Sequence, residues 1–252
     1  MAESEEKAFE EGSQNGEIEM TFLDHLEELR WRIIYSVIGI LIGTAVALYF
    51  SDFFVDKVLL LPARTAKFNL QNLRPFGQLF LYFQTAMVVG LIISFPNVIY
   101  QLWKFIAPAL KQTEKKYIKW IVLFTTFCFI CGIVFGYFLM LPITLKFAAS
   151  FGTVTIANNF ALDEYLSIVL SIILGAGLVF ELPMLSFFLS KIGILTPKLM
   201  RKYRRHSIVV ILILSAFLSP GTDPVSQLML AVPLVLLYEI SIIVSKIFQK
   251  KT

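Results

Sequence analysis

Phe180-Glu181-Leu182-Pro183 lies inside a long apolar stretch, residues 166–189, and Glu181 is the only acidic residue there. A carboxylate near the middle of a bilayer costs roughly 3 kcal/mol even on mild insertion scales. Pro183 removes a backbone donor and should loosen the helix one turn earlier, near Val179. We therefore predict a functional polar site at Glu181. The alternative is a buried acid that only hydrogen-bonds a neighbouring helix.

The composition places the chain among membrane proteins. Of its 252 residues, 57% are hydrophobic and only 16% are charged, and the mean hydropathy is +0.76. Soluble domains are less apolar and carry more charge than this. Several apolar runs approach the roughly 20 residues with which a helix spans a bilayer, and the alternation of a transmembrane β-barrel is missing. The sequence predicts an all-α membrane protein.

No pattern of residues indicates catalysis or a bound cofactor. Cys128 and Cys131 have CxxC spacing but lie in an apolar span, where thiolates are disfavoured, so we predict two packing residues. His25 and His206 are far apart, and no dinucleotide motif, P-loop or nucleophile elbow occurs. We expect no enzyme activity, no cofactor and no metal site. The net charge of +4 belongs to membrane loops, so we expect no nucleic-acid partner.

The N-terminal region divides into a tail and a helix. Residues 1–17 carry six Glu and one Lys, which predicts a disordered acidic tail. Residues 18–32 are predicted to form an amphipathic helix that ends at the basic and aromatic anchor Arg30-Trp31-Arg32. Its polar face, with Asp24, Glu27 and Glu28, carries excess negative charge that suits a cationic partner. Residues 18–248 are predicted to be one membrane domain, followed by a short basic tail, 249–252.

Six membrane spans are predicted, at residues 33–50, 79–103, 117–141, 166–189, 207–218 and 228–244, with Pro96 interrupting the second. The two long loops at 51–78 and 142–162 would lie on one side, the first with a short surface helix. The fifth span gives only about 18 Å of helix. It and the short sixth span would cover a core of about 30 Å poorly, so local thinning of the bilayer is predicted. Alternatively, flanking residues extend both helices and no thinning occurs.

The distribution of Lys and Arg predicts the orientation. With both termini on the side opposite the two long loops, that side holds most of the 22 basic residues. The other side holds only Lys57, Arg64, Lys67, Arg74 and Lys146. The positive-inside rule makes the basic side cytoplasmic, with both termini on it.

Several motifs resemble the TatC family of the twin-arginine protein translocase. His25-Leu26-Glu27-Glu28-Leu29-Arg30-Trp31-Arg32 is similar to its cytoplasmic N-terminal motif. Gln101-Leu102-Trp103-Lys104-Phe105-Ile106-Ala107-Pro108-Ala109-Leu110, followed by Glu114-Lys115-Lys116, is similar to its first cytoplasmic loop. Phe180-Glu181-Leu182-Pro183 and the turn Ser219-Pro220…Asp223…Gln227 also match. The likeness covers roughly residues 20–248.

The resemblance implies a receptor subunit with six spans in the bacterial cytoplasmic (inner) membrane. Such subunits recognise the twin-arginine signal peptides of folded proteins and assemble single-span Tat subunits of the A and B types. They self-associate in a larger complex and use the proton gradient.

The resemblance also assigns roles to individual residues. Two carboxylates, Glu28 and Glu114, would bind the signal peptide's arginines, whose planar fork suits a carboxylate better than lysine does. Further positions are Phe105 for signal-peptide binding, the intramembrane acids Glu181 and Glu239, and Pro62, Asp223 and Gln227 for partner docking or assembly.

Each of these roles has a structural alternative. Glu28 could pair only with Arg32, Glu114 could only stabilise a helix N-terminus, and Glu27 could replace Glu28 as the acid that faces the peptide. The other positions could serve packing, turns or capping, and Glu239 could reach the cytoplasmic interface. The alternative function is a proton-coupled secondary transporter of a small solute, in which Glu181 and Glu239 carry protons.

Overall fold

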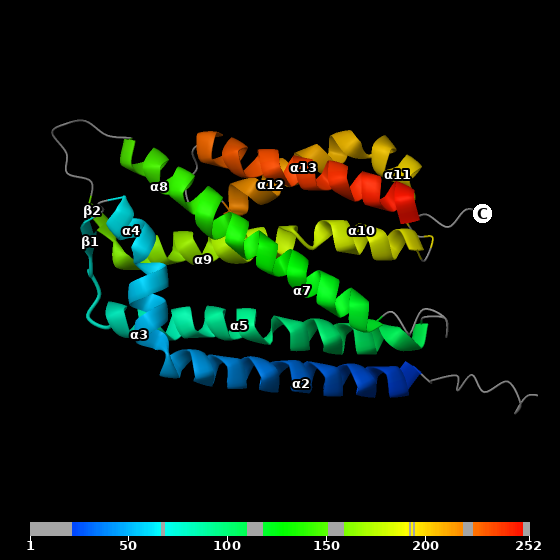
Figure 1. Cartoon of the computed structure of the whole chain (residues 1–252), viewed down its shortest axis with the longest axis horizontal. Helices are drawn as coiled ribbons and strands as arrows, with labels where there is room; N and C mark the ends of the chain where they lie inside the picture. Colours follow the sequence, from blue (N-terminus) through cyan, green and yellow to red (C-terminus); the bar gives the residue numbers. More distant parts are fainter. Residues whose placement is uncertain are drawn as a thin grey trace, which may run out of the picture.

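A computed structural model of the chain describes residues 22–66, 69–109, 118–150, 159–191, 193, 195–218 and 224–248. Most of the long helices run roughly along the long axis of the molecule, and one slopes across them (Figure 1). In chain order the helices and strands are α2 (Phe22–Tyr49), α3 (Ser51–Phe53), the π-helical η1 (Phe54–Leu59), α4 (Leu61–Thr65), β1 (Asn69–Gln71), α5 (Gly77–Ile106), the 3-10 segment η2 (Ala107–Ala109), α7 (Ile118–Phe135), the π-helical η3 (Gly136–Met140), α8 (Leu141–Ser150), β2 (Asn159–Ala161), α9 (Leu162–Val179), α10 (Leu182–Lys191), α11 (Pro197–Lys202), α12 (Arg204–Leu218) and α13 (Pro224–Phe248).

Four helical stretches are long and apolar enough to cross a membrane: Leu23–Tyr49, Gly77–Ile106, Ile118–Ser150 and Leu162–Lys191. They correspond to the first four predicted spans. Together with the apolar composition, they support a multi-pass helical membrane protein, as predicted. Each is longer than its predicted span, because apolar periodicity marks the lipid-facing part of a helix and gives no signal where the helix continues beyond it.

The predicted division between an amphipathic helix and a first span is wrong. α2 is one continuous helix from Phe22 to Tyr49, and Arg30-Trp31-Arg32 lies within it. No glycine or proline separates the two predicted segments, and Arg and Trp are both tolerated in a helix interior. The predicted break at Pro96 is also wrong, since α5 continues through that residue. Residues 142–162, predicted as a loop, begin with the helix α8.

The break near Pro183 is confirmed. α9 ends at Val179 and α10 begins at Leu182, so Phe180 and Glu181 separate two helices that together make the fourth long stretch. Pro183 lies in the first turn of α10, where a missing backbone N–H costs least. The polar residue of this stretch is therefore at the one place where its backbone is irregular.

Of the last two helices, one is short as predicted and the other is longer than predicted. α12 has 15 residues and is short, as expected. α13 has 25 residues and is longer than the predicted 228–244, because Pro224 begins the helix and the basic end continues it to Phe248. In Figure 1 both helices stop short of the end where β1 and β2 lie. The expected shortness of the sixth span is therefore wrong for the helix itself.

α2 and α5 approach closely because small residues face each other. A Cβ atom added at Gly90 would lie 2.4 Å from the Thr44 backbone nitrogen, and one at Gly43 would lie 2.6 Å from the Gly90 carbonyl oxygen. The Ser94 hydroxyl donates to the Gly39 carbonyl at 2.6 Å. In lipid, where helices gain little from hiding apolar surface, such close backbone contact is a main source of association.

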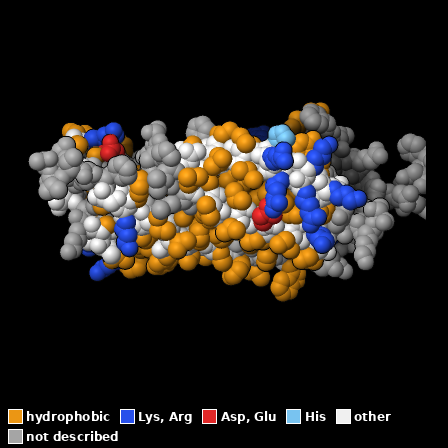
Figure 2. All heavy atoms as spheres, turned by 90° about the horizontal axis from the view of Figure 1, so that it is seen from above, with side chains coloured by type: hydrophobic (Ala, Val, Ile, Leu, Met, Phe, Trp, Pro, Cys, Tyr) orange, Lys and Arg blue, Asp and Glu red, His pale blue; other side chains and the backbone are white. Residues whose placement is uncertain are grey.

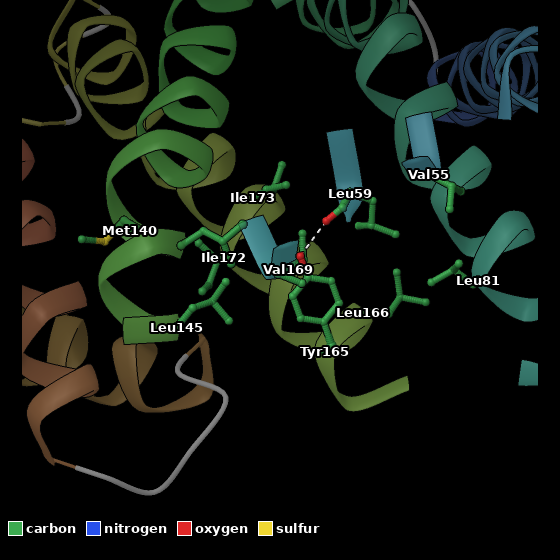
Figure 3. Close-up of a cluster of buried hydrophobic side chains, with 12 residues drawn as sticks. Val55, Leu59, Leu81, Met140, Leu145, Tyr165, Leu166, Val169, Ile172 and Ile173 are labelled. Atoms are coloured by element: carbon green, nitrogen blue, oxygen red, sulfur yellow. Dashed lines mark hydrogen bonds between the residues drawn. The ribbon is translucent and has the colours of Figure 1, made fainter. Parts of the chain in front are cut away.

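The end of the molecule that carries α3, α4 and the strands has its own core (Figure 3). β1 pairs in parallel with β2, with Asn69 opposite Asn159. This pairing joins the segment that precedes α5 to the segment that precedes α9. Tyr165 of α9 is buried in this core, and its hydroxyl donates to the Leu59 carbonyl at 2.6 Å. A buried carbonyl at the end of η1 is thereby satisfied by α9.

Replacing Tyr165 with Phe should lower the free energy of unfolding by about 1–2 kcal/mol, because the Leu59 carbonyl loses a buried donor. Thermal unfolding in detergent should show a melting temperature lower by about 2–4 °C for each kcal/mol. Tyr49→Phe, at a side chain that is 84% exposed, is the matched control and should leave the melting temperature unchanged. Equal shifts in both variants would contradict the prediction.

Candidate functional site

The first turns of α2 pack on the last turns of α5. The rings of His25 and Phe105 stack with centroids 4.3 Å apart and planes 13° apart. Glu28 lies three residues beyond His25, hence on the same face of α2. Two of the predicted binding residues, Glu28 and Phe105, therefore belong to one corner of the molecule.

Glu28 is half-satisfied in this corner. Its Oε1 accepts a hydrogen bond from Arg32 Nη2 at 2.9 Å, and its side chain is 16% exposed. Its Oε2 is buried and has no hydrogen-bond partner within the described ranges. Glu27 is exposed, so Glu28 is the member of the adjacent pair that faces α5. The expected Glu28–Arg32 pair is present, and it uses only one carboxylate oxygen.

A chain of polar side chains connects Glu28 to the body of α5, and the sequence analysis missed it. Arg32 Nη1 donates to Gln101 Oε1 at 3.3 Å, and Gln101 Nε2 donates to Asn97 Oδ1 at 3.4 Å. Asn97 Nδ2 donates to the Tyr35 carbonyl at 3.2 Å. The signal that the sequence offered was a pair of amide residues, Asn97 and Gln101, spaced i,i+4 in an apolar span.

Glu114 and Asp223 lie outside the described residues, so their predicted roles remain predictions. Pro62 and Gln227 are far from Glu28. Pro62 is in α4, beside a cavity of about 190 Å³ whose lining also includes Tyr137 and Pro142. Gln227 Nε2 donates to the Leu212 carbonyl at 2.9 Å and thereby joins α13 to α12.

Glu181 is buried at the break between α9 and α10, with 8% of the residue exposed. Its Oε1 is buried and has no hydrogen-bond partner among the residues that the structure describes. Its neighbours Phe180 and Pro183 line an apolar cavity of about 610 Å³, together with Cys128 and Cys131 of α7. Both cysteines are free thiols. Glu181 is thus a buried carboxyl group with an unused acceptor.

Glu239 has a different environment. It forms an ion pair with Arg204, the first residue of α12, and both side chains are partly exposed. Figure 2 shows basic side chains gathered at this end of the molecule. The exposed basic residues of α11 and α12 are Lys198, Arg201, Lys202, Arg204 and Arg205. Glu239 therefore lies beside these basic residues, whereas Glu181 lies at the break between α9 and α10.

Comparisons with known proteins show which proteins this chain resembles. The family model described as Sec-independent protein translocase protein (TatC) matches residues 24–233. A protein named Sec-independent protein translocase protein TatC from Blattabacterium sp. subsp. Periplaneta americana is 34% identical, with 94% of this chain and 99% of the relative covered. Its namesake from Aquifex aeolicus is 36% identical, with 92% and 97% covered. A crystal structure of the twin arginine translocase receptor TatC superposes with a TM-score of 0.80 at 36% identity and covers 88% of this chain and 98% of that one.

Proposed function

The chain belongs to the TatC family of Sec-independent protein translocase proteins, and from this premise we propose that it is the signal-peptide receptor and core subunit of a twin-arginine translocase. It binds the twin-arginine signal peptides of folded cargo proteins and assembles single-span subunits of the A and B types. The cargo then crosses the membrane at the expense of the proton gradient. No covalent chemistry by this chain is required.

The proposed placement is the bacterial inner membrane, with six spans and both termini in the cytoplasm. Four long apolar helical stretches support the multi-pass part of this topology. The excess of Lys and Arg in α11, in α12 and at the C-terminal end supports the orientation. The corner that holds Glu28 and Phe105 then faces the cytoplasm, where a signal peptide first arrives.

The observation that carries the proposal is the half-satisfied carboxylate of Glu28. A buried acceptor without a donor is unfavourable, and a guanidinium group offers several N–H donors in a fixed plane. One arginine of the signal peptide binds Glu28, and the other binds Glu114. The ring of Phe105, stacked on His25 beside this site, contacts the peptide.

The remaining predicted residues serve assembly in this proposal. Single-span partners pack near α12 and α13, where Gln227 joins the two helices, and Asp223, which comes just before α13 in the sequence, takes part in the same docking. Pro62 lines a cavity beside α4 and shapes the end of the molecule that carries α3, α4 and the strands. Glu181 offers its unused oxygen to a polar group of a partner or of the peptide. Several copies of the subunit associate in the working complex.

The test is the affinity of the purified protein for a twin-arginine signal peptide. Glu28→Gln and Glu114→Gln should each weaken binding by about tenfold, because the amide oxygen can still accept a hydrogen bond but no longer carries the negative charge that strengthens it. Glu27→Gln is the matched control, since it changes the adjacent, exposed acid, and should change the affinity by less than about twofold.

Undiminished binding in both Glu28→Gln and Glu114→Gln would refute the proposed recognition. A peptide with paired lysines should bind the unmodified protein more weakly than the twin-arginine peptide, because lysine lacks the planar fork. The ion pair between Glu239 and Arg204 favours the receptor proposal over the transporter alternative, in which Glu239 would be the second proton carrier.

A further inference from the structure

We propose that Gln101 is a positioning residue for Glu28. It holds one end of the Arg32 guanidinium group, so that Arg32 binds only one oxygen of Glu28, and the other, buried oxygen can accept a hydrogen bond from an arriving arginine once Glu28 rotates outward. This inference rests on the proposed function, because it concerns how the same site is kept ready.

The Arg32–Glu28 pair is one hydrogen bond short of a two-pronged pair. Arg32 Nη2 donates to Glu28 Oε1 at 2.9 Å. Arg32 Nε and Glu28 Oε2 are both buried, and neither has a hydrogen-bond partner in the described part of the chain. Nε and Nη2 form one edge of the guanidinium plane, and this edge can pair with both oxygens of a carboxylate in a bidentate contact. The missing bond is therefore the one between Nε and Oε2.

In this proposal, the hydrogen bond from Arg32 to Gln101 holds the guanidinium group in an orientation in which Nε does not reach Glu28 Oε2. Arg32 Nη1, on the other side of the plane, donates to Gln101 Oε1 at 3.3 Å. A rotation that brought Nε onto Oε2 would swing Nη1 away from Gln101. Gln101 is itself held, since its amide donates to Asn97, whose amide donates to the Tyr35 carbonyl on α2. These hydrogen bonds form a polar relay from Arg32 through Gln101 and Asn97 to the Tyr35 carbonyl. The relay begins and ends on α2 and fixes Arg32 between two acceptors.

This arrangement makes Glu28 receptive. A carboxylate in a complete bidentate pair with Arg32 would have to give up a charge-assisted hydrogen bond before it could bind an arriving arginine. An unpaired Oε2 has no hydrogen bond to lose. A small outward rotation of the Glu28 side chain is then enough for Oε2 to accept a hydrogen bond from the arriving arginine. Gln101 therefore acts on the signal peptide through Arg32 and Glu28, without contact of its own.

The test removes the acceptor at position 101. Gln101→Leu should weaken binding of the twin-arginine peptide by about tenfold, because Arg32 then closes on both oxygens of Glu28. In a Glu28→Gln background the same change should have no further effect, since residues that act through one group are not additive. Gln84→Leu, the same substitution at an exposed site on α5, is the matched control and should leave the affinity unchanged.

A second change separates positioning from packing. Arg32→Lys in the Gln101→Leu protein should restore binding to within about twofold of Arg32→Lys alone, because an ammonium group cannot form the two-pronged pair. A packing defect at position 101 would not be rescued in this way. If Gln101→Leu fails to give folded protein, Gln101→Met, which keeps the length of the side chain and offers only a weakly accepting sulfur, takes its place.

The outcomes distinguish the two proposals. If Glu28→Gln itself leaves binding unchanged, the proposed function of Glu28 fails. If Glu28→Gln weakens binding but Gln101→Leu does not, or if Arg32→Lys gives no rescue, the role of Gln101 is overturned while the role of Glu28 stands.

Discussion

Replacing Gly90 with Leu should leave little or no folded protein in the membrane, with a loss of stability of at least about 3 kcal/mol. The first two long helices meet at this glycine. A Cβ atom there would lie 2.4 Å from the Thr44 backbone nitrogen, 2.5 Å from its Cα and 2.5 Å from its hydroxyl oxygen. Two of these three atoms belong to the backbone, so a change of rotamer cannot make room.

The clash would separate α2 from α5 along much of their length. The hydrogen bond from Ser94 to the Gly39 carbonyl and the polar relay from Asn97 to Arg32 both require the present spacing. Any side chain at position 90 would therefore disturb the corner that holds Glu28 as well as the helix pair. The measurement is the yield of monodisperse protein in detergent and its thermal unfolding.

Two further variants make the argument specific. Ala45→Leu adds a leucine to the exposed face of α2, next to Thr44, and should be tolerated. Thr44→Ala removes the one movable atom of the clash, so it should not rescue Gly90→Ala. Rescue by Thr44→Ala would show that the side chain, and not the backbone, limits the approach of the helices.

Much of the fold follows from local sequence. The apolar runs gave the first four long stretches, and Pro183 gave the break between α9 and α10 because a proline acts on its own helix. Boundaries failed where no local signal exists. α2 continues through Arg30-Trp31-Arg32, and α8 continues the third stretch beyond Met140. The pairing of β1 with β2 joins residues about 90 positions apart, so no local pattern could reveal it.

The candidate site was predictable only in part. Motif resemblance singled out Glu28 and Phe105, and the structure brings their helices together through the His25–Phe105 stack. The relay through Gln101 and Asn97 depends on which faces of α2 and α5 meet, and that is decided by the glycines of both helices. Sequence spacing places residues on one helix face but does not choose the partner of that face. The partner of Glu239 was missed for the same reason.

Replacing Glu181 with Met should make the protein more stable and inactive in export. One oxygen of the buried Glu181 carboxyl group has no hydrogen-bond partner in the described ranges, and an unsatisfied buried polar atom costs about 1–3 kcal/mol. Met has a similar length without that atom, so the melting temperature in detergent should rise by about 2–4 °C for each kcal/mol gained. If Glu181 offers its oxygen to a partner or to the peptide, as we propose, export of a folded reporter with a twin-arginine signal should fall to background.

A rise in stability combined with a loss of function separates this reading from a structural one, because a residue that only held the fold would lower both when replaced. Glu164→Met, at an exposed acid on α9, is the matched control and should change neither quantity much. Glu181→Gln keeps an acceptor at the break and should retain part of the export activity. A lower melting temperature in Glu181→Met would mean that the carboxyl group stabilises the break between α9 and α10, and normal export would mean that no partner uses its free oxygen.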